Sequence, residues 1–119
     1  MKYDPNLMLQ LAKLIEAKPD RELLSVDQIK LPMFSRDQLC EHLVLLEEAD
    51  LIVSSVQFAD DKVHDILVSR LTLTGHKFLQ KARDDVWWRK FIQKAESEIG
   101  FFTRQGMLVV FTHYLTQSM

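Results

Sequence analysis

The apolar positions at the start of the chain recur with the spacing of an amphipathic helix. Asp4 followed by Pro5 is a typical helix start, because an Asp side chain caps free amide groups and proline needs no acceptor in the first turn. Apolar residues then repeat at steps of three and four up to Lys18, where Pro19 ends the segment. Residues 19–34 fit either a short helix or a strand with a loop, and both interpretations stay open.

Two pairs of Ser and Gln have the spacing of a helix capping box. Ser25 and Gln28 form the first pair, and Ser35 with Gln38 forms the second, directly before an apolar stretch. The leucines behind the second pair fall on one helical face. The second box therefore predicts a helix over about residues 36–49.

Two runs rich in β-branched residues follow, with a short Asp-containing turn between them. The runs LIVSSVQF and VHDILVSRL flank the sequence ADDK. This pattern predicts an antiparallel hairpin over about residues 51–71, with its tip near residues 60–62.

Helical periodicity returns in the last third of the chain. Thr72 is expected to cap a helix in which apolar residues recur as far as Ile99, and Gly100 is a natural stop. A final helix capped by Thr103 is predicted through the closing segment. A central strand is the alternative for residues 107–115, because this segment contains β-branched residues.

The order helix, short element, helix, hairpin and helix predicts an α+β, mostly helical fold. It is the order of a winged helix, in which a helix-turn-helix is followed by a β-hairpin wing. The chain has 119 residues, 47% of them hydrophobic, which suits one domain with its own core. We expect residues 1–74 to form the winged-helix core, and residues 75–119 to form a C-terminal helical extension that packs on it.

Two strings add a resemblance to known sequences. EHLVLLEEADLIV resembles the end of the recognition helix and the start of the wing in many bacterial winged-helix regulators, and RLTLTGHKFL resembles the second wing strand running into the next helix. Asp50 stands where such sequences usually carry Gly, and Asp adopts left-handed backbone more readily than most residues.

With the tail GHKFLQKARDDVWWRK, the chain is similar over about residues 5–115 to a set of small uncharacterised proteins common in phages and prophages, known only as a domain of unknown function. The resemblance implies a winged-helix core and a mobile-element setting. It implies no particular activity.

The net charge of −2 conceals an uneven distribution. Residues 1–71 hold eight Lys/Arg and thirteen Asp/Glu, a balance of −5, whereas residues 72–119 hold seven and four, a balance of +3. The expected recognition helix and wing, residues 35–65, hold two basic side chains against eight acidic ones, a balance of −6. Because phosphate contacts contribute much of the affinity for DNA, this surface is expected to disfavour nucleic acid.

A winged helix recognises DNA through the outward face of its second helix and through its wing. The outward positions predicted here are Asp37, Glu41, Leu45 and Glu48, which leaves few groups suited to DNA. The candidate DNA-contacting residues are Arg36, Gln38, His42 and Lys62.

Six basic side chains lie on the predicted C-terminal helix. They form either a solvated helix face or a docking stripe for an acidic partner. They are Lys77, Lys81, Arg83, Arg89, Lys90 and Lys94.

The apolar residues of the C-terminal extension are the second candidate interaction surface. Trp87 and Trp88 are adjacent, so on a helix they point about 100° apart and cannot both face one partner. Residues 107–111 are apolar on every side, and a domain of this size does not easily enclose such a helix, so we expect a homodimer. The expected interface consists of Trp87, Trp88, Phe101, Phe102, Met107, Val110, Phe111 and Tyr114.

Little in the sequence indicates catalysis. Three scattered Gly residues build no phosphate-binding loop, and four isolated His residues lack metal-ligand spacing. Cys40, the single cysteine, excludes an intrachain disulfide and is expected to be a small buried hydrophobe. The start of the chain lacks the apolar stretch of a signal peptide, and no run is long enough to span a bilayer. We expect a cytoplasmic protein with no cofactor, no metal and no membrane contact.

These observations favour a non-enzymatic winged-helix protein of phage or prophage type. It would act as a regulatory or accessory module through protein–protein contacts and self-association. A winged-helix DNA-binding transcriptional regulator is the alternative, and an enzyme is a weaker third hypothesis.

Overall fold

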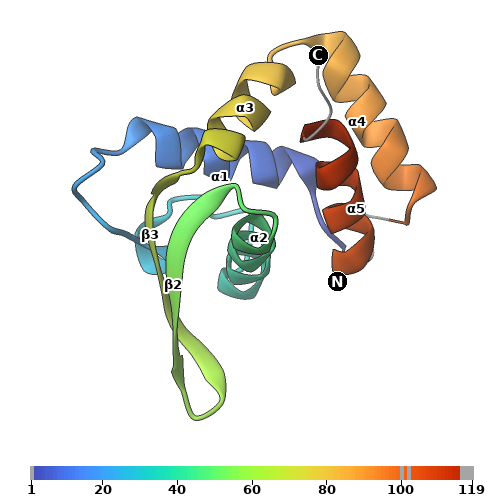
Figure 1. Ribbon diagram of the computed structural model, residues 1–119. Helices are drawn as coiled ribbons and strands as arrows, with labels where there is room; N and C mark the ends of the chain where they lie inside the picture. The colour runs from blue at the N-terminus through green and yellow to red at the C-terminus, as the bar shows by residue number, and fades with distance from the viewer. Residues whose placement is uncertain (1, 100, 102, 116–119) are drawn as a thin grey trace.

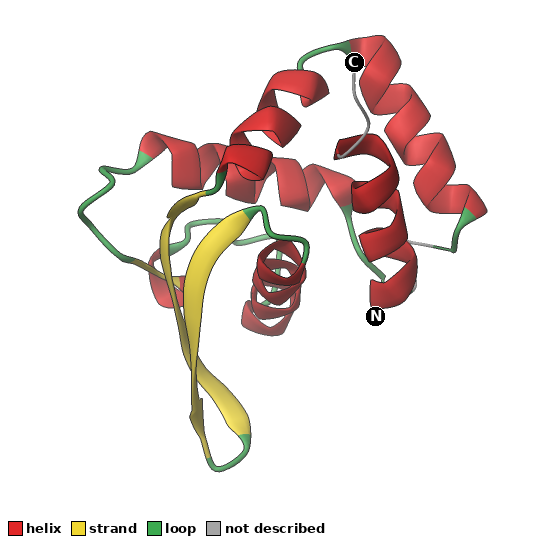
Figure 2. Cartoon of the chain, in the orientation of Figure 1, coloured by secondary structure: helices red, strands yellow, loops and turns green. Residues whose placement is uncertain are grey.

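The computed structural model describes residues 2–99, 101 and 103–115. Within them the fold is mixed α+β and mostly helical, as expected, with one small antiparallel sheet (Figures 1 and 2). In chain order the elements are α1 (Pro5–Ala17), β1 (Leu24–Ser25), the 3-10 turn η1 (Val26–Gln28), α2 (Arg36–Glu48), β2 (Ile52–Ala59), β3 (Lys62–Leu71), α3 (Leu73–Ala82), α4 (Asp85–Ser97) and α5 (Arg104–Leu115).

The predicted cap residues begin the helices. Asp4 Oδ1 accepts hydrogen bonds from the amides of Asn6 at 2.8 Å and Leu7 at 3.4 Å, so α1 begins at Pro5. Thr72 caps α3 by accepting from the Gly75 amide. These caps form from local sequence alone, which is why the prediction was correct at both.

Residues 19–34 contain both of the structures that the sequence left open. Leu24 and Ser25 form a short strand that pairs with β3, opposite Val68 and Leu67. Ser25 also caps η1, with Gln28 completing the box. The segment therefore enters the sheet and turns within five residues.

The sheet has the order β1-β3-β2, with both pairs antiparallel. Asp60 and Asp61 form the hairpin turn with φ values of 54° and 63°, a pair of positive values that suits the right-handed twist of the strands. The two register shifts between β2 and β3 each leave an extra residue on β3, namely Ser69 and His64. The hairpin extends away from the helices (Figure 2).

One contiguous core joins the helices to the sheet. α1 crosses the middle of the molecule, with α2 and the sheet on one side and α3 on the other, while α4 and α5 lie toward its N-terminal end (Figure 1). Leu7, Leu11 and Ile15 of α1 are almost fully buried along this path. α1 is therefore the central element of the fold.

The single helix expected after Thr72 is wrong, because the chain turns at Arg83 and Asp84. Asp84 Oδ1 accepts from the amides of Val86 at 2.8 Å and Trp87 at 3.3 Å, and this second cap starts α4. The closing segment is the helix α5 and not a strand, and Thr103 accepts from the Gly106 amide at 3.0 Å as predicted. Gly100, the expected stop, lies outside the described residues.

Candidate functional site

α2 stands where the sequence predicts the recognition helix, and its buried side is wider than expected. Its capping box is present, since Ser35 Oγ accepts from the Gln38 amide and Gln38 Oε1 accepts from the Ser35 amide. The buried residues of α2 are Leu39, Cys40, His42, Leu43, Leu45 and Leu46. Leu45 was expected to face outward and is fully buried, because other parts of the fold cover a second side of α2.

The exposed side of α2 is acidic. Asp37, Glu41 and Glu48 are all exposed and follow one another at steps of four and seven residues, which places them on one helical stripe. Glu48 Oε1 lies 3.1 Å from Nη1 of Arg104, so one of the three carboxylates has a nearby cation from α5.

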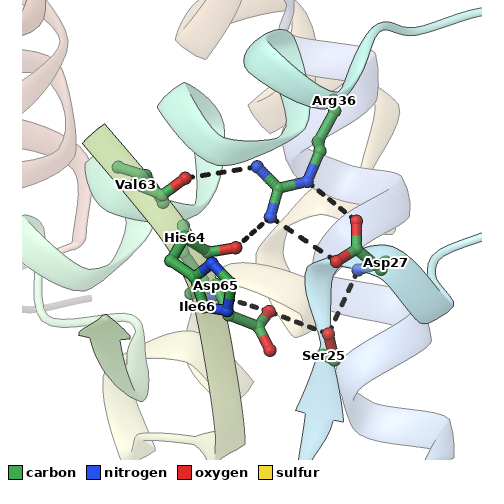
Figure 3. A network of polar contacts seen from close by, with 7 residues as sticks. All are labelled: Ser25, Asp27, Arg36, Val63, His64, Asp65 and Ile66. Atoms are coloured by element: carbon green, nitrogen blue, oxygen red, sulfur yellow. Dashed lines mark hydrogen bonds and ion pairs between the residues drawn. The ribbon is translucent and has the colours of Figure 1, made fainter. Parts of the chain in front are cut away.

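The side chain of Arg36, at the start of α2, forms hydrogen bonds with other parts of the fold (Figure 3). Its Nε donates to Asp27 Oδ1 at 2.8 Å, and its guanidinium also donates to the backbone carbonyls of Val63 and His64. The hydrogen bond from Arg36 lowers the pKa of the Asp27 carboxyl below its usual value. The guanidinium therefore connects the start of α2 with η1 and with the part of β3 nearest the hairpin turn.

The same network includes side chains from all three segments. Ser25 Oγ donates to Asp65 Oδ1 at 2.8 Å, and Asp65 Oδ1 also accepts from the Ile66 amide. His64 is one of the two extra residues on β3, at the point where the hairpin passes beyond β1. Arg36 thus contacts the edge of β3 where no strand covers it.

His42 does not face solvent, so its place among the candidate DNA-contacting residues is wrong. The ring is 1% exposed, with Nε2 accepting from the Asp4 amide at 2.9 Å and Nδ1 lying 2.7 Å from the Gln38 carbonyl. Tyr3 packs edge-on against it, with ring centroids 5.3 Å apart. Burial lowers the pKa of His42, which keeps the imidazole neutral.

Of the other two candidate DNA contacts, Gln38 lies on α2 and Lys62 lies at the start of β3, where it lines an open groove. Gln38 is half-buried and its side chain carbonyl is used in the helix cap. Lys62 is exposed at the start of β3, beside Asp60 and Asp61. The groove has a volume of about 680 Å³ and is lined by Arg36, Asp37, Cys40, Glu41, Lys62 and Val63.

The six basic residues of the expected docking stripe do not form one row, because the turn at residues 83–84 divides them between α3 and α4. Arg83 lies 4.0 Å from Glu16, and Lys94 lies 2.9 Å from Glu98. Lys77 and Lys81 are half-buried on α3, whereas Arg89 and Lys90 are exposed on α4. The exposed basic surface of α4 is thus shorter than the sequence indicated.

Most residues of the expected dimer interface lie inside the single chain. Met107, Val110 and Phe111 are 0–2% exposed, and Phe101 is 9% exposed. Trp87, Trp88 and Tyr114 are half-buried against Phe91. Phe102 lies outside the described residues. A homodimer stays a prediction, and these buried side chains do not supply its surface.

The described residues offer no cluster suited to a metal ion. None of them form a group of three or more His, Cys, Asp or Glu side chains with metal-binding geometry. Cys40 is buried as expected, and burial raises the pKa of its thiol. No helix in the described part of the chain has the length and hydrophobicity needed to cross a bilayer.

A comparison with protein families matches residues 2–101 to a family described as "Hypothetical protein (DUF2513)". The chain belongs to this family. The match covers α1 through α4, and therefore α2, the hairpin and the Arg36 network. It confirms the expected assignment to a domain of unknown function. No curated protein and no solved structure matches the chain.

Two features of this DUF2513 chain were missed from the sequence. Asp27 and Asp65 were not connected with Arg36 and Ser25, because their contacts join residues 9–40 positions apart. The burial of His42 depends on Asp4, which is 38 positions away. A signal was present in Leu45, since an apolar residue on the supposed outer face indicated that α2 is covered on two sides.

Proposed function

We propose that this chain is a winged-helix module that binds a protein partner with basic residues, in a regulatory or accessory role of phage or prophage type. The binding surface is the α2–hairpin face, defined here as Asp37, Glu41, Glu48, Asp60 and Asp61. The proposal has two supports: the arrangement of elements and the charge of this face.

The arrangement of elements is compatible with a winged helix. A helix, a short strand, one helical turn and a second helix precede the hairpin, and β3 lies between β1 and β2. α2 then takes the place of the recognition helix and the hairpin takes the place of the wing. One 3-10 turn, η1, stands where a helix-turn-helix has its first helix.

The acidic character of the α2–hairpin face is the observation that carries the proposal. A duplex docked as on a winged helix would bring phosphates to Asp37 and Glu41 of α2 and to the Asp60–Asp61 turn, where like charges repel. Arg36 could offset this repulsion only by leaving Asp27 and β3. A partner that carries Lys or Arg meets complementary charge on the same face.

A charge-inversion experiment tests this interpretation. We expect the wild-type protein to show no binding to a mixed-sequence 25-base-pair duplex by fluorescence anisotropy at low salt. The variant Asp37→Lys/Glu41→Lys should gain salt-sensitive DNA binding, because the shape suits a groove and two repelling charges on α2 are replaced by attracting ones. Asp20→Lys/Glu96→Lys has the same net charge with both changes outside this face, and should gain much less.

Deca-lysine is a probe for the site of basic docking. We expect its addition to ¹⁵N-labelled protein to shift the amide signals of Asp37, Glu41, Asp60 and Asp61 more than those of Asp20 and Glu22. Equal shifts at all exposed acidic residues would contradict a defined docking face. Tight wild-type DNA binding that is lost in Arg36→Ala or Lys62→Ala would establish the alternative, a DNA-binding transcriptional regulator.

A further inference from the structure

β2 forms an open edge of the sheet. Among the described residues it pairs with β3 on one side and with no strand on the other. Figure 1 shows β2 at the front of the hairpin, with β3 behind it. Alternate residues of an antiparallel strand direct their N–H and C=O groups away from the neighbouring strand. The outer side of β2 therefore presents a row of backbone groups that can pair with another strand.

The composition of β2 leaves this edge suited to pairing. Its eight residues, IVSSVQFA, include no charged residue, no Pro and no Gly, the features that usually protect an edge strand. Both extra residues of the hairpin lie on β3, so β2 runs without a bulge. Phe58 is 68% exposed and Val53 is 38% exposed, which adds apolar contact area along the strand.

The other edge of the hairpin is covered. β1 pairs with β3 at Leu67 and Val68, and farther toward the tip Arg36 donates to the carbonyls of Val63 and His64. The two edges thus differ: polar groups of the fold occupy the edge of β3, whereas no strand in the described part of the chain pairs with the edge of β2.

The charges at the two ends of β2 disfavour pairing with a second copy. Asp50 precedes the strand, and Asp60 with Asp61 follows it. Antiparallel pairing of two β2 strands would bring the Asp60–Asp61 turn of each copy close to Asp50 of the other, and like charges across strands are destabilising. The same charges favour a strand that ends in basic residues.

We propose that the outer edge of β2 binds an extended segment of a partner protein by β-strand addition, and that this segment has an uncharged, β-branched centre with Lys or Arg at both ends. Backbone hydrogen bonds to β2 provide the affinity, and the Asp residues at the two ends select the basic termini. This inference rests on the proposed function, because it names the segment through which the basic partner binds.

The probe is a fluorescein-labelled nine-residue peptide with alternating Val and Thr in the centre and two Lys at each end. We expect it to bind the wild-type protein in a fluorescence-anisotropy titration. On binding, hydrogen exchange should slow at alternate amides of β2, while the amides of η1 and β1 keep their exchange rates.

Backbone methylation distinguishes strand addition from attraction by charge. Two further peptides carry N-methyl groups on the odd or on the even central residues, so each blocks one side of the peptide strand. We expect one of them to lose binding at least tenfold and the other to bind like the unmodified peptide. Equal binding of all three would overturn strand addition and leave the proposed function intact, since charge alone would then explain the contact.

A conservative pair of variants tests the role of the acidic ends. Asp60→Asn/Asp61→Asn removes two charges and keeps residues that accept positive φ. Its affinity for the peptide should fall roughly three- to tenfold at low salt. Asp20→Asn/Glu22→Gln removes the same charge elsewhere and should bind like the wild type. No binding of the unmodified peptide to the wild type would overturn the inference, whereas the deca-lysine mapping decides separately on the proposed function.

Discussion

The hairpin end and the C-terminal helices of this molecule are held together in different ways. At the hairpin end, Arg36 and Ser25 join α2, η1 and β3 through hydrogen bonds between partly exposed groups. In the C-terminal helices, Phe78 and Phe91 form the centre of an aromatic cluster, with ring centroids 5.8 Å apart and both rings fully buried. The hairpin end adds these polar contacts to the packing of α2, whereas the centre of the C-terminal helices is aromatic packing.

This difference shows which residues belong to the core and which are available for a partner. The aromatic residues that looked like an interface in the sequence pack within one chain, because the turn at residues 83–84 folds α4 back and brings Phe91 close to Phe78 and Phe111. The hairpin end buries one side of α2 but keeps its acidic groups and most of β2 exposed. The candidate binding surface therefore lies at the polar end.

The largest effect is expected from Phe91→Ala in the aromatic cluster. Phe91 is fully buried and contacts the rings of Trp87 and Trp88, so truncation should lower the free energy of unfolding by about 3–5 kcal/mol. Val86→Ala, at an exposed position of the same helix, should change it by less than about 0.5 kcal/mol. Urea unfolding monitored by circular dichroism measures both.

Unchanged stability of Phe91→Ala together with weaker self-association in light scattering would reverse this comparison. The cluster would then act as an interface and not as core.

His42 should have the next largest effect, because it joins the N-terminal segment to α2. His42→Leu leaves the Asp4 amide without its acceptor and should lower the free energy of unfolding by about 1–3 kcal/mol. Urea titrations at neutral pH measure this loss. An equally stable His42→Leu variant would show that the hydrogen bond to Asp4 contributes nothing.

The same residue predicts a pH dependence. Burial lowers the pKa of His42 in the folded protein, so below about pH 6.5 the unfolded chain binds a proton that the folded chain does not. Stability should therefore fall as the pH drops from 7 toward 5, and His42→Gln should reduce the slope over this range. A slope that is the same in both proteins would rule out His42 as its source.

Arg36→Ala should have a local effect at the polar end. Loss of the hydrogen bonds to Val63 and His64 should speed hydrogen exchange of the hairpin amides near Lys62 roughly two- to tenfold, with the helices unaffected. Arg70→Ala is the matched control on the same strand, since Arg70 donates to the carbonyl of its neighbour Leu71. Faster exchange throughout the molecule would show that Arg36 supports the whole fold and not the hairpin alone.

The smallest effect is expected from Arg89→Ala and Lys90→Ala on α4. Both side chains are exposed, so each change should alter the free energy of unfolding by less than about 0.5 kcal/mol and leave deca-lysine binding unchanged. Heat or urea unfolding together with the deca-lysine titration of ¹⁵N-labelled protein measures these outcomes. If either variant weakened binding of the basic probe, the partner surface would have to include α4.

Much of the fold could be predicted because its signals are local. Asp4, Ser35 and Thr72 cap helices through groups within a few residues of themselves, and the alternating runs around the Asp60–Asp61 turn specify a hairpin. The break before α4 also had a local signal in Asp84. The regular apolar spacing across Asp84 obscured this signal, because two helices joined by a short turn can keep the same spacing of apolar residues.

The candidate site was harder to predict, because it depends on residues far apart in the chain. The sequence places Arg36 at the start of α2 and cannot show that Asp27 and the carbonyls of β3 surround it. It likewise cannot show that the Asp4 amide donates a hydrogen bond to Nε2 of His42. Outward positions on a helix are defined by the elements that pack around it.

The sequence by itself determined where α1, α2, α3 and α5 begin, the position of the hairpin, the acidic character of α2 and the hairpin, and the uncharged composition of β2. These properties depend on the order of residues and on contacts within a few positions. Only the tertiary structure decided that Arg36 and His42 serve the fold, that the aromatic residues form a core, and that β2 is an open edge. Each of these depends on which residues are buried, and which stay exposed to water, when distant segments of the chain pack together.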